Sequence, residues 1–159
     1  MSGNAVQTVG TRLFIANTAI CTTETAYKAL TWTEVEEVED IGTFGISAEK
    51  VTYKTLADGV VRKAKGTVDY GSPTLKLPRV PTGPGQAAIK AAAKDRNNAY
   101  NFKVEFDDAP DGGTATTIYM HAFVMSYTTE IGAADGIVRA TVGLEVDAEP
   151  IEVAAAEAP

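Results

Sequence analysis

The side chains best suited to catalysis are few in this sequence and lie far apart. His121 is the only histidine and Cys21 the only cysteine. His121 stands in a stretch with the alternation of a β-strand, where a histidine more often packs or faces solvent than reacts. No serine or cysteine has the context of a nucleophile elbow, so a Ser–His or Cys–His pair has no support. We therefore predict that the protein is not an enzyme and that Cys21 is an inert thiol.

Metal and cofactor sites have equally little support. One histidine and one cysteine cannot complete a zinc site without carboxylates. The carboxylates of Asp107, Asp108 and Asp111 lack the alternating ligand spacing and closing glutamate of an EF-hand calcium loop. The glycine-containing segment 81–86 lacks the Lys-Ser/Thr that ends a phosphate-binding loop. We expect no metal and no cofactor.

Acidic side chains are dense between residues 34 and 40, where five carboxylates occur. General acid–base catalysis requires one carboxyl group in an apolar pocket, and nothing in this segment predicts such a pocket. A solvated acidic face is therefore the better interpretation of this segment.

Charge is unevenly distributed along the chain, whose net charge is −7. Residues 1–49 carry two basic and seven acidic side chains, residues 50–103 carry eleven and three, and residues 104–159 carry one and eleven. The acidic total argues against a dedicated nucleic-acid-binding protein, which needs clustered lysine and arginine. Two interpretations stay open: solvated faces on a single fold, or a head-to-tail contact in which basic and acidic blocks of different copies meet.

The elements that would position these residues are mostly strands. A length of 159 residues suits one domain. Alternation and β-propensity predict strands at residues 10–16, 29–38, 47–56, 60–65, 67–70, 102–106, 116–127 and 138–146, with a strand or loop at 75–80. Ala57-Asp58-Gly59 is typical of a hairpin turn. The strand at 116–127 has apolar side chains on both faces, which predicts a central strand or a subunit interface.

One helix is predicted at residues 86–96, where alanines and Ile89 recur among lysines. Thr82 is the expected N-terminal cap, and Pro84 suits the first turn. The Ala-rich face is small enough to lie flat on a sheet. The fold class we predict is mostly β: a β-sandwich or partly open barrel of about seven or eight strands, with one flanking α-helix and a long central loop or hairpin. Such a fold leaves sheet edges that copies of the chain could pair.

The ends of the chain are predicted to be flexible arms around one β domain. Residues 1–9 form the N-terminal arm, residues 10–147 the domain and residues 148–159 the C-terminal arm. No apolar run approaches the roughly 20 residues that span a bilayer. The first ten residues lack the features of a secretory signal, so we expect synthesis in the cytoplasm.

The order of these features resembles the tail tube (major tail) proteins of long, non-contractile-tailed bacteriophages, the siphophage type. The resemblance covers roughly residues 10–147 and rests on an ordered set of segments rather than one motif. The matching segments are Gly10–Ile15, Thr31–Trp32 with Val35, Val38 and Ile41, Phe44–Gly45, Ala48–Glu49 and Tyr53, Lys65–Gly71, Gly85–Ile89, Tyr100–Val104, and Tyr119, Phe123–Val124 and Ser126.

The resemblance implies a structural subunit of the virion tail, made in the host cytoplasm. Such subunits form hexameric rings that stack into a hollow tube, with tape-measure, tail-tip and terminator proteins as partners. Genome DNA passes through the tube during ejection, with no membrane contact. An acidic lumen would repel phosphates and let DNA slide without adhering.

The resemblance also suggests roles for particular charged residues. Acids that alternate with apolar residues on predicted strands are the candidates for the lumen wall: Glu34, Glu36, Glu105, Asp107 and Glu145. In relatives the central excursion reaches a neighbouring ring, so the candidate inter-ring contacts are Lys54, Arg62, Lys63 and Lys65. Two alternatives stay open: an inner tube protein of a contractile tail or secretion system, and a monomeric ligand-binding β-sandwich.

Overall fold

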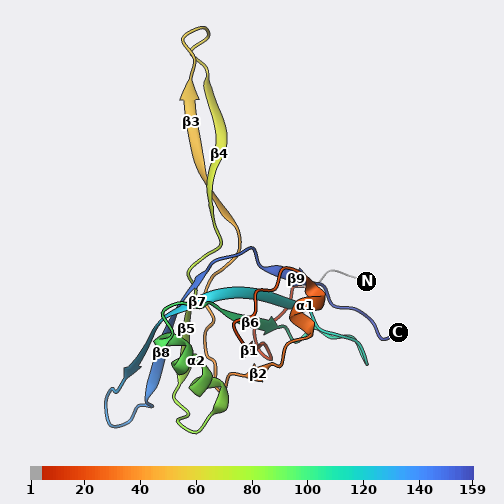
Figure 1. Cartoon of the computed structure of the whole chain (residues 1–159), viewed down its shortest axis with the longest axis vertical. Coiled ribbons are helices and arrows are strands. Elements are labelled where there is room, and N and C mark those ends of the chain that lie inside the picture. The colour runs from red at the N-terminus through yellow and green to blue at the C-terminus, as the bar shows by residue number, and fades with distance from the viewer. Residues whose placement is uncertain (1–4) are drawn as a thin grey trace.

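The computed structural model describes residues 5–159, and it consists of a curved β-sheet body from which one long hairpin projects (Figure 1). The strands are β1 (Arg12–Ile15), β2 (Thr33–Glu34), β3 (Ser47–Lys54), β4 (Val61–Asp69), β5 (Thr74–Pro78), β6 (Tyr100–Glu105), β7 (Thr117–Glu130), β8 (Arg139–Val146) and β9 (Ile151–Val153). The helices are α1 (Glu24–Lys28) and α2 (Pro84–Lys94). No helix in the described residues is long and apolar enough to cross a membrane.

The body is one seven-stranded sheet in the order β2-β1-β6-β7-β8-β5, with β9 paired to β7, and all of its strand pairs are antiparallel. The sheet curls into a half-barrel, which is the partly open form of the predicted fold class. The mostly β fold with a flanking helix and a central hairpin is therefore confirmed. β7 lies at the centre of the sheet, as its apolar residues on both faces predicted.

The hydrophobic core lies between one face of the sheet and α2, and we call this side of the sheet the helix face. Its side chains alternate along the strands, as the period of two requires. Buried residues on it are Leu13, Ile15, Leu75, Leu77, Phe102, Val104, Met120, Ala122, Val142 and Leu144. Ile89 and Ala92 of α2 complete this cluster. The small alanines let the helix approach the sheet closely, which is why an Ala-rich segment serves as the flanking helix.

The start of α2 differs from the expected one. Its N-cap is Gly83 rather than Thr82, and Gly83 has no side chain to accept a hydrogen bond from the first turn. The carboxylate of Glu36 takes that role instead, accepting from the backbone N–H of Gly85 (2.9 Å) and of Gln86 (3.0 Å). Pro84 occupies the first turn as expected, since its missing N–H would have no partner there.

The strand predicted at 29–38 is mostly absent. Only Thr33–Glu34 pairs with β1, and a short helix, α1, precedes it. The hydroxyl oxygen of Thr23 caps this helix by accepting from Ala26 N–H (3.2 Å), and Glu24 and Lys28 pair one turn apart. This helix lies before the predicted strand, in a segment for which the sequence predicted no element, and these local bonds favour its helical turn.

The segment expected to be the C-terminal arm contains β9, which pairs with the first residues of β7. A further bridge joins Ala156 to Thr114 in the β6–β7 connection. The flexibility of residues 148–159 stays a prediction, as does that of the N-terminal arm, whose residues 1–4 lie outside the described residues.

Candidate assembly surfaces

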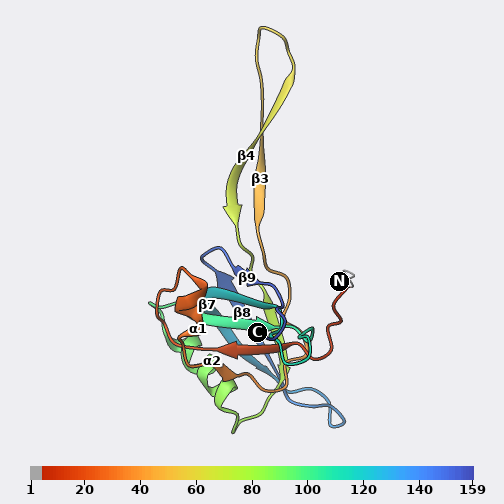
Figure 2. The same cartoon turned by 90° about the vertical axis from the view of Figure 1, so that its right-hand side faces the viewer.

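The hairpin formed by β3 and β4 stands clear of the body in both views (Figures 1 and 2). Its turn forms where Asp-Gly predicted it. Gly59 has a φ of 66°, and the Asp58 carboxylate accepts from the Thr55 hydroxyl (2.6 Å) and from Val60 N–H (3.0 Å). Arg62 donates to the other carboxylate oxygen of Asp58 (2.6 Å). These bonds hold the pKa of Asp58 below its usual value, the Thr55 hydroxyl being the largest cause.

The two faces of this hairpin have different chemistry. Cross-strand pairs place Lys50 beside Lys65, and Thr52 beside Lys63, on one face. Lys54 lies on the same face, so four lysines share it; we call it the lysine face. The opposite face carries Val51 paired with Ala64 and Tyr53 paired with Arg62. Of the four candidate inter-ring residues, Lys54, Lys63 and Lys65 therefore lie together, whereas Arg62 lies on the other face and is paired with Asp58.

The apolar side chains of the hairpin are exposed. Tyr53 is 54% exposed and Val51 47%, and Leu56, Val60 and Val61 near the turn are also open to solvent. A two-stranded hairpin alone is marginally stable in water. Exposed apolar groups on such an element indicate a surface that another chain covers.

The sheet face opposite α2 carries three of the candidate lumen acids, and we call it the open face. Cross-strand pairing puts Glu34 beside Phe14, Glu105 beside Arg12, and Glu145 beside Phe123. Because directly paired residues project to the same side of a sheet, all three carboxylates share this face. Asp107 is exposed two residues beyond the end of β6.

Charges on the open face are partly compensated. Arg12 contacts Glu105 (2.9 Å) and Glu34 (3.6 Å), and Lys103 lies 3.9 Å from Glu105. The Lys103 ammonium also lies 4.2 Å from the centre of the Phe14 ring. Burial lowers the pKa of Lys103 from its ordinary value. The acids near β1 and β6 are therefore accompanied by two cations, which weakens their repulsion of phosphates.

Glu145 and Asp107 have no cation within ion-pair distance among residues 5–159. A Glu145 carboxylate oxygen accepts from the Ser72 hydroxyl (2.6 Å), which leaves its charge uncompensated. Glu36 differs from the other four candidates because it faces α2 and caps that helix. Its carboxylate is therefore directed away from the open face.

At one end of the open face, α1 and the following loop cover the sheet with aromatic rings. Tyr27 stacks on Tyr119 with ring centres 5.0 Å apart, and Trp32 lies 5.9 Å from Tyr119. The Trp32 N–H donates to the Tyr27 carbonyl (3.1 Å), which fixes the loop. Burial raises the pKa of both tyrosines above the ordinary value.

His121 also lies on this side of the sheet, beside an acidic partner that the sequence did not predict. Its Nδ1 lies 2.9 Å from a carboxylate oxygen of Asp147, just beyond β8. Asp147 N–H donates to the His121 carbonyl (3.0 Å), so the pair ties β8 to β7. No serine or cysteine hydrogen bonds to this histidine within the described residues. The pair therefore has a structural role, because it joins the end of β8 to β7.

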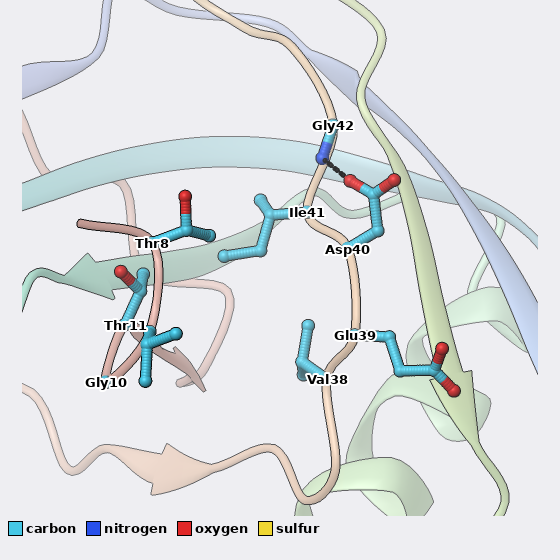
Figure 3. Close-up of a pocket in the computed structure, with 9 residues that line it drawn as sticks. Thr8, Gly10, Thr11, Val38, Glu39, Asp40, Ile41 and Gly42 are labelled. Carbon is cyan, nitrogen blue, oxygen red and sulfur yellow. Dashed lines mark hydrogen bonds between the residues drawn. The ribbon is translucent and has the colours of Figure 1, made fainter.

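A hollow of about 390 Å³ lies between residues 8–11 and 38–42 (Figure 3). Ile41 and Thr8 point toward each other across it, whereas the carboxylates of Glu39 and Asp40 point away. Glu39 accepts from Arg139 Nε (3.0 Å), and Asp40 accepts from Gly42 N–H (2.9 Å). Both acids therefore brace the surrounding loops. No cluster of three metal-ligating side chains occurs in the part of the chain that the structure describes.

Comparison with known proteins bears directly on these surfaces. A family model described as "Phage tail tube protein, TTP" matches residues 4–155. No curated protein matches the chain.

Solved structures also resemble the chain, at identities that show the fold alone. A chain from the anti-feeding prophage baseplate has a TM-score of 0.72 at 13% identity, covering 97% of this chain and 98% of that one. A chain from the sheath/tube terminator of the PVC extracellular contractile injection system has a TM-score of 0.70 at 14% identity, covering 97% and 100%. The SPP1 tail tube subunit has a TM-score of 0.64 at 13% identity, covering 94% and 80%.

Proposed function

The chain belongs to the phage tail tube protein family, and from this premise we propose that its copies form hexameric rings that stack into a hollow conduit for genome DNA. The family is structural and is not an enzyme family, so the protein is a structural subunit of the tube in the virion tail. The ring number, the stacking and the passage of DNA are the proposal. The anti-feeding prophage baseplate is described as six-fold symmetrised, which supports a hexameric ring here.

The observation that carries this proposal is the projecting hairpin. Its strands pair only with each other, and its apolar side chains are exposed. Rings stacked on one another would cover this surface. The lysine face, with Lys54, Lys63 and Lys65, would meet acidic surface of the neighbouring ring, since the chain outside residues 50–103 is strongly acidic. Arg62 contributes by holding the turn through Asp58 rather than by facing the partner with the lysines.

The open face is the wall we assign to the lumen. It carries Glu34, Glu105 and Glu145 together, and Glu145 has no compensating cation among the described residues. A like-charged wall repels phosphate and keeps DNA from adhering. Because Arg12 and Lys103 accompany the first two acids, the repulsion would come mainly from Glu145. Asp107 lies at the border of this face and is a weaker candidate.

The proposal extends to partners and to one alternative assembly. A tape-measure protein inside the tube, and terminator and tail-tip proteins at its ends, would bind this subunit. An inner tube of a contractile tail or secretion system is the second candidate. It is favoured by the TM-score of 0.70 to the chain from a contractile injection system, against 0.64 for the SPP1 tail tube subunit.

Assembly of the purified protein tests the proposal. Negative-stain electron microscopy at increasing protein concentration should show rings and stacked tubes. The double variant Lys63→Glu/Lys65→Glu should form rings but stack poorly, with Arg96→Glu as a control cation on the body. A protein that stays monomeric at every salt and protein concentration would refute the proposal and favour a monomeric binding domain.

A further inference from the structure

A basic groove lies on the helix face side of the molecule, outside every surface discussed above. It has a volume of about 320 Å³ and runs between α2 and the far part of β7. Arg79, Lys90 and Lys94 line it, with Ala87, Ala91 and Tyr127 beside them. Lys90 and Lys94 are four residues apart on α2 and so project toward the same side.

The cations of this groove lack anionic partners. None of the three forms an ion pair within residues 5–159. The Arg79 guanidinium is positioned by the Tyr127 ring, 5.6 Å from its centre, and by a hydrogen bond to the Thr129 hydroxyl (3.3 Å). Its Nε atom is buried and has no hydrogen-bond partner among the described residues.

An acidic edge lies at the other end of β7. The β6–β7 connection and the C-terminal segment are joined there by the Thr114–Ala156 bridge. Gly113 permits this contact, because a Cβ at that position would collide with the Ala156 carbonyl oxygen. The neighbouring acids Asp111 and Glu157 are both exposed and have no ion-pair partner in the described part of the chain.

The groove and the acidic edge cannot meet within one copy. Tyr127 and Thr117 lie ten residues apart on β7, roughly 34 Å along an extended strand. Figure 1 shows the far ends of β7 and β8 on one side of the body and the C-terminus on the other. Complementary patches on opposite sides of one subunit produce a head-to-tail contact, which closes into a ring when the rotation allows.

We propose that the basic groove of one copy receives the acidic edge of the next copy within the ring. Carboxylates of Asp111 and Glu157 would pair with Lys90, Lys94 and the Arg79 guanidinium, which line the groove. This inference rests on the proposed ring and names its lateral contact, which is distinct from the stacking contact of the hairpin.

Two charge-reversed variants test the contact. In Lys90→Glu/Lys94→Glu both surfaces are acidic, and in Asp111→Lys/Glu157→Lys both are basic. Each variant alone should need at least about 10-fold more protein to assemble than the wild type, because like charges oppose. Mixed in equal amounts, they should assemble as alternating copies near the wild-type concentration. The Arg96→Glu variant, outside the groove, should assemble as the wild type does.

The readout separates this inference from the proposed function. Sedimentation velocity of the dilute mixture should show complexes between the two variants that neither forms alone, whether or not tubes appear. If the wild type assembles but the single variants assemble equally well, or the mixture shows no complex, the lateral contact is refuted. If the mixture forms complexes while the wild type gives no tubes, the contact stands and the tube proposal fails. Circular dichroism melting confirms that each variant is folded.

Discussion

At the scale of single residues, Glu36 caps a helix, a role that its sequence pattern did not predict. Its place in an acidic, alternating segment predicted a lumen acid. The structure puts its carboxylate against two N–H groups at the start of α2, where the helix dipole also favours negative charge. Gln86 binds the same segment from the other side, donating to the Glu36 carbonyl (2.9 Å) while only 2% exposed.

Replacing Glu36 with alanine should destabilise the folded chain by roughly 1–2 kcal/mol, because two N–H groups of α2 lose their acceptor. The Glu37→Ala variant is the matched control. Glu37 is exposed, and its backbone φ of 57° would be the same with alanine in its place. Loss of the Glu37 side chain should therefore lower the free energy of unfolding by under about 0.5 kcal/mol. Urea unfolding followed by Trp32 fluorescence measures both. Equal effects of the two substitutions would contradict the capping role.

The stacked tyrosines predict a pH dependence. Burial raises the pKa of Tyr27 and Tyr119 in the folded state, so the unfolded chain loses these protons first as pH rises. Their contribution to stability is therefore complete below about pH 10 and is lost through the alkaline range above it.

The Tyr27→Phe/Tyr119→Phe variant should show a shallower alkaline decrease in the free energy of unfolding than the wild type. Urea titrations at a series of pH values measure this slope. Tyr53→Phe, on the exposed hairpin, is the control and should keep the wild-type slope. Identical slopes for all three proteins would show that burial of the tyrosine pair does not shift their titration.

At the scale of elements, the β3–β4 hairpin has apolar side chains that the isolated chain leaves exposed to water. A two-stranded hairpin that packs against nothing is marginally stable, and its exposed apolar side chains indicate a surface that another molecule covers. One face of the hairpin is the lysine face, and the other carries Val51 and Tyr53; we call the second the apolar face. A molecule that covers the hairpin would make an electrostatic contact with the lysine face and a hydrophobic contact with the apolar face.

Tyr53→Ser should leave the stability of the monomer within about 0.5 kcal/mol of the wild type, because Tyr53 is exposed in the single chain. Tube formation should decrease strongly, because the buried contact between rings would lose an aromatic anchor. Thr52→Ser, on the opposite face of the same strand, is the control. Light scattering during assembly measures the effect, and unimpaired tubes would remove the apolar face from the stacking contact.

At the scale of the whole molecule, the charge blocks of the sequence become separate surfaces of the fold. Basic residues of the middle block form both the lysine face of the hairpin and the groove beside α2. The acids of the two ends spread over the open face and the acidic edge. In the proposed assembly these four surfaces would face three neighbours: the next ring, the next copy in the ring, and the DNA in the bore.

Glu145→Lys should leave tubes intact, because Glu145 is exposed and its side-chain hydrogen bond is to Ser72 at the surface. A cation facing the bore would attract phosphates and slow DNA delivery. The measurement is the rate of genome ejection from phage carrying the substitution, with Glu145→Gln as the control for lost charge alone. Unchanged ejection by the lysine variant would place Glu145 outside the lumen.

Much of the fold was predictable from the sequence because its signals are local. Alternation placed β6, β7 and β8, Asp58-Gly59 placed the hairpin turn, and the alanines with Ile89 identified α2. The short helix α1 was missed because its five residues carry too little periodic pattern to stand out. β9 was missed because three residues carry too little pattern to stand out from a tail rich in alanine and glutamate.

What the sequence alone determined is therefore most of the element types, the absence of a catalytic motif and the resemblance to tail tube proteins. Only the tertiary structure decided which charges share a surface. Glu36 meets Gln86 across 50 residues of chain, and Arg12 meets Glu105 across 93. Strand periodicity states which residues alternate, but the pairing of distant strands decides which face they join, and that pairing is a property of the folded sheet.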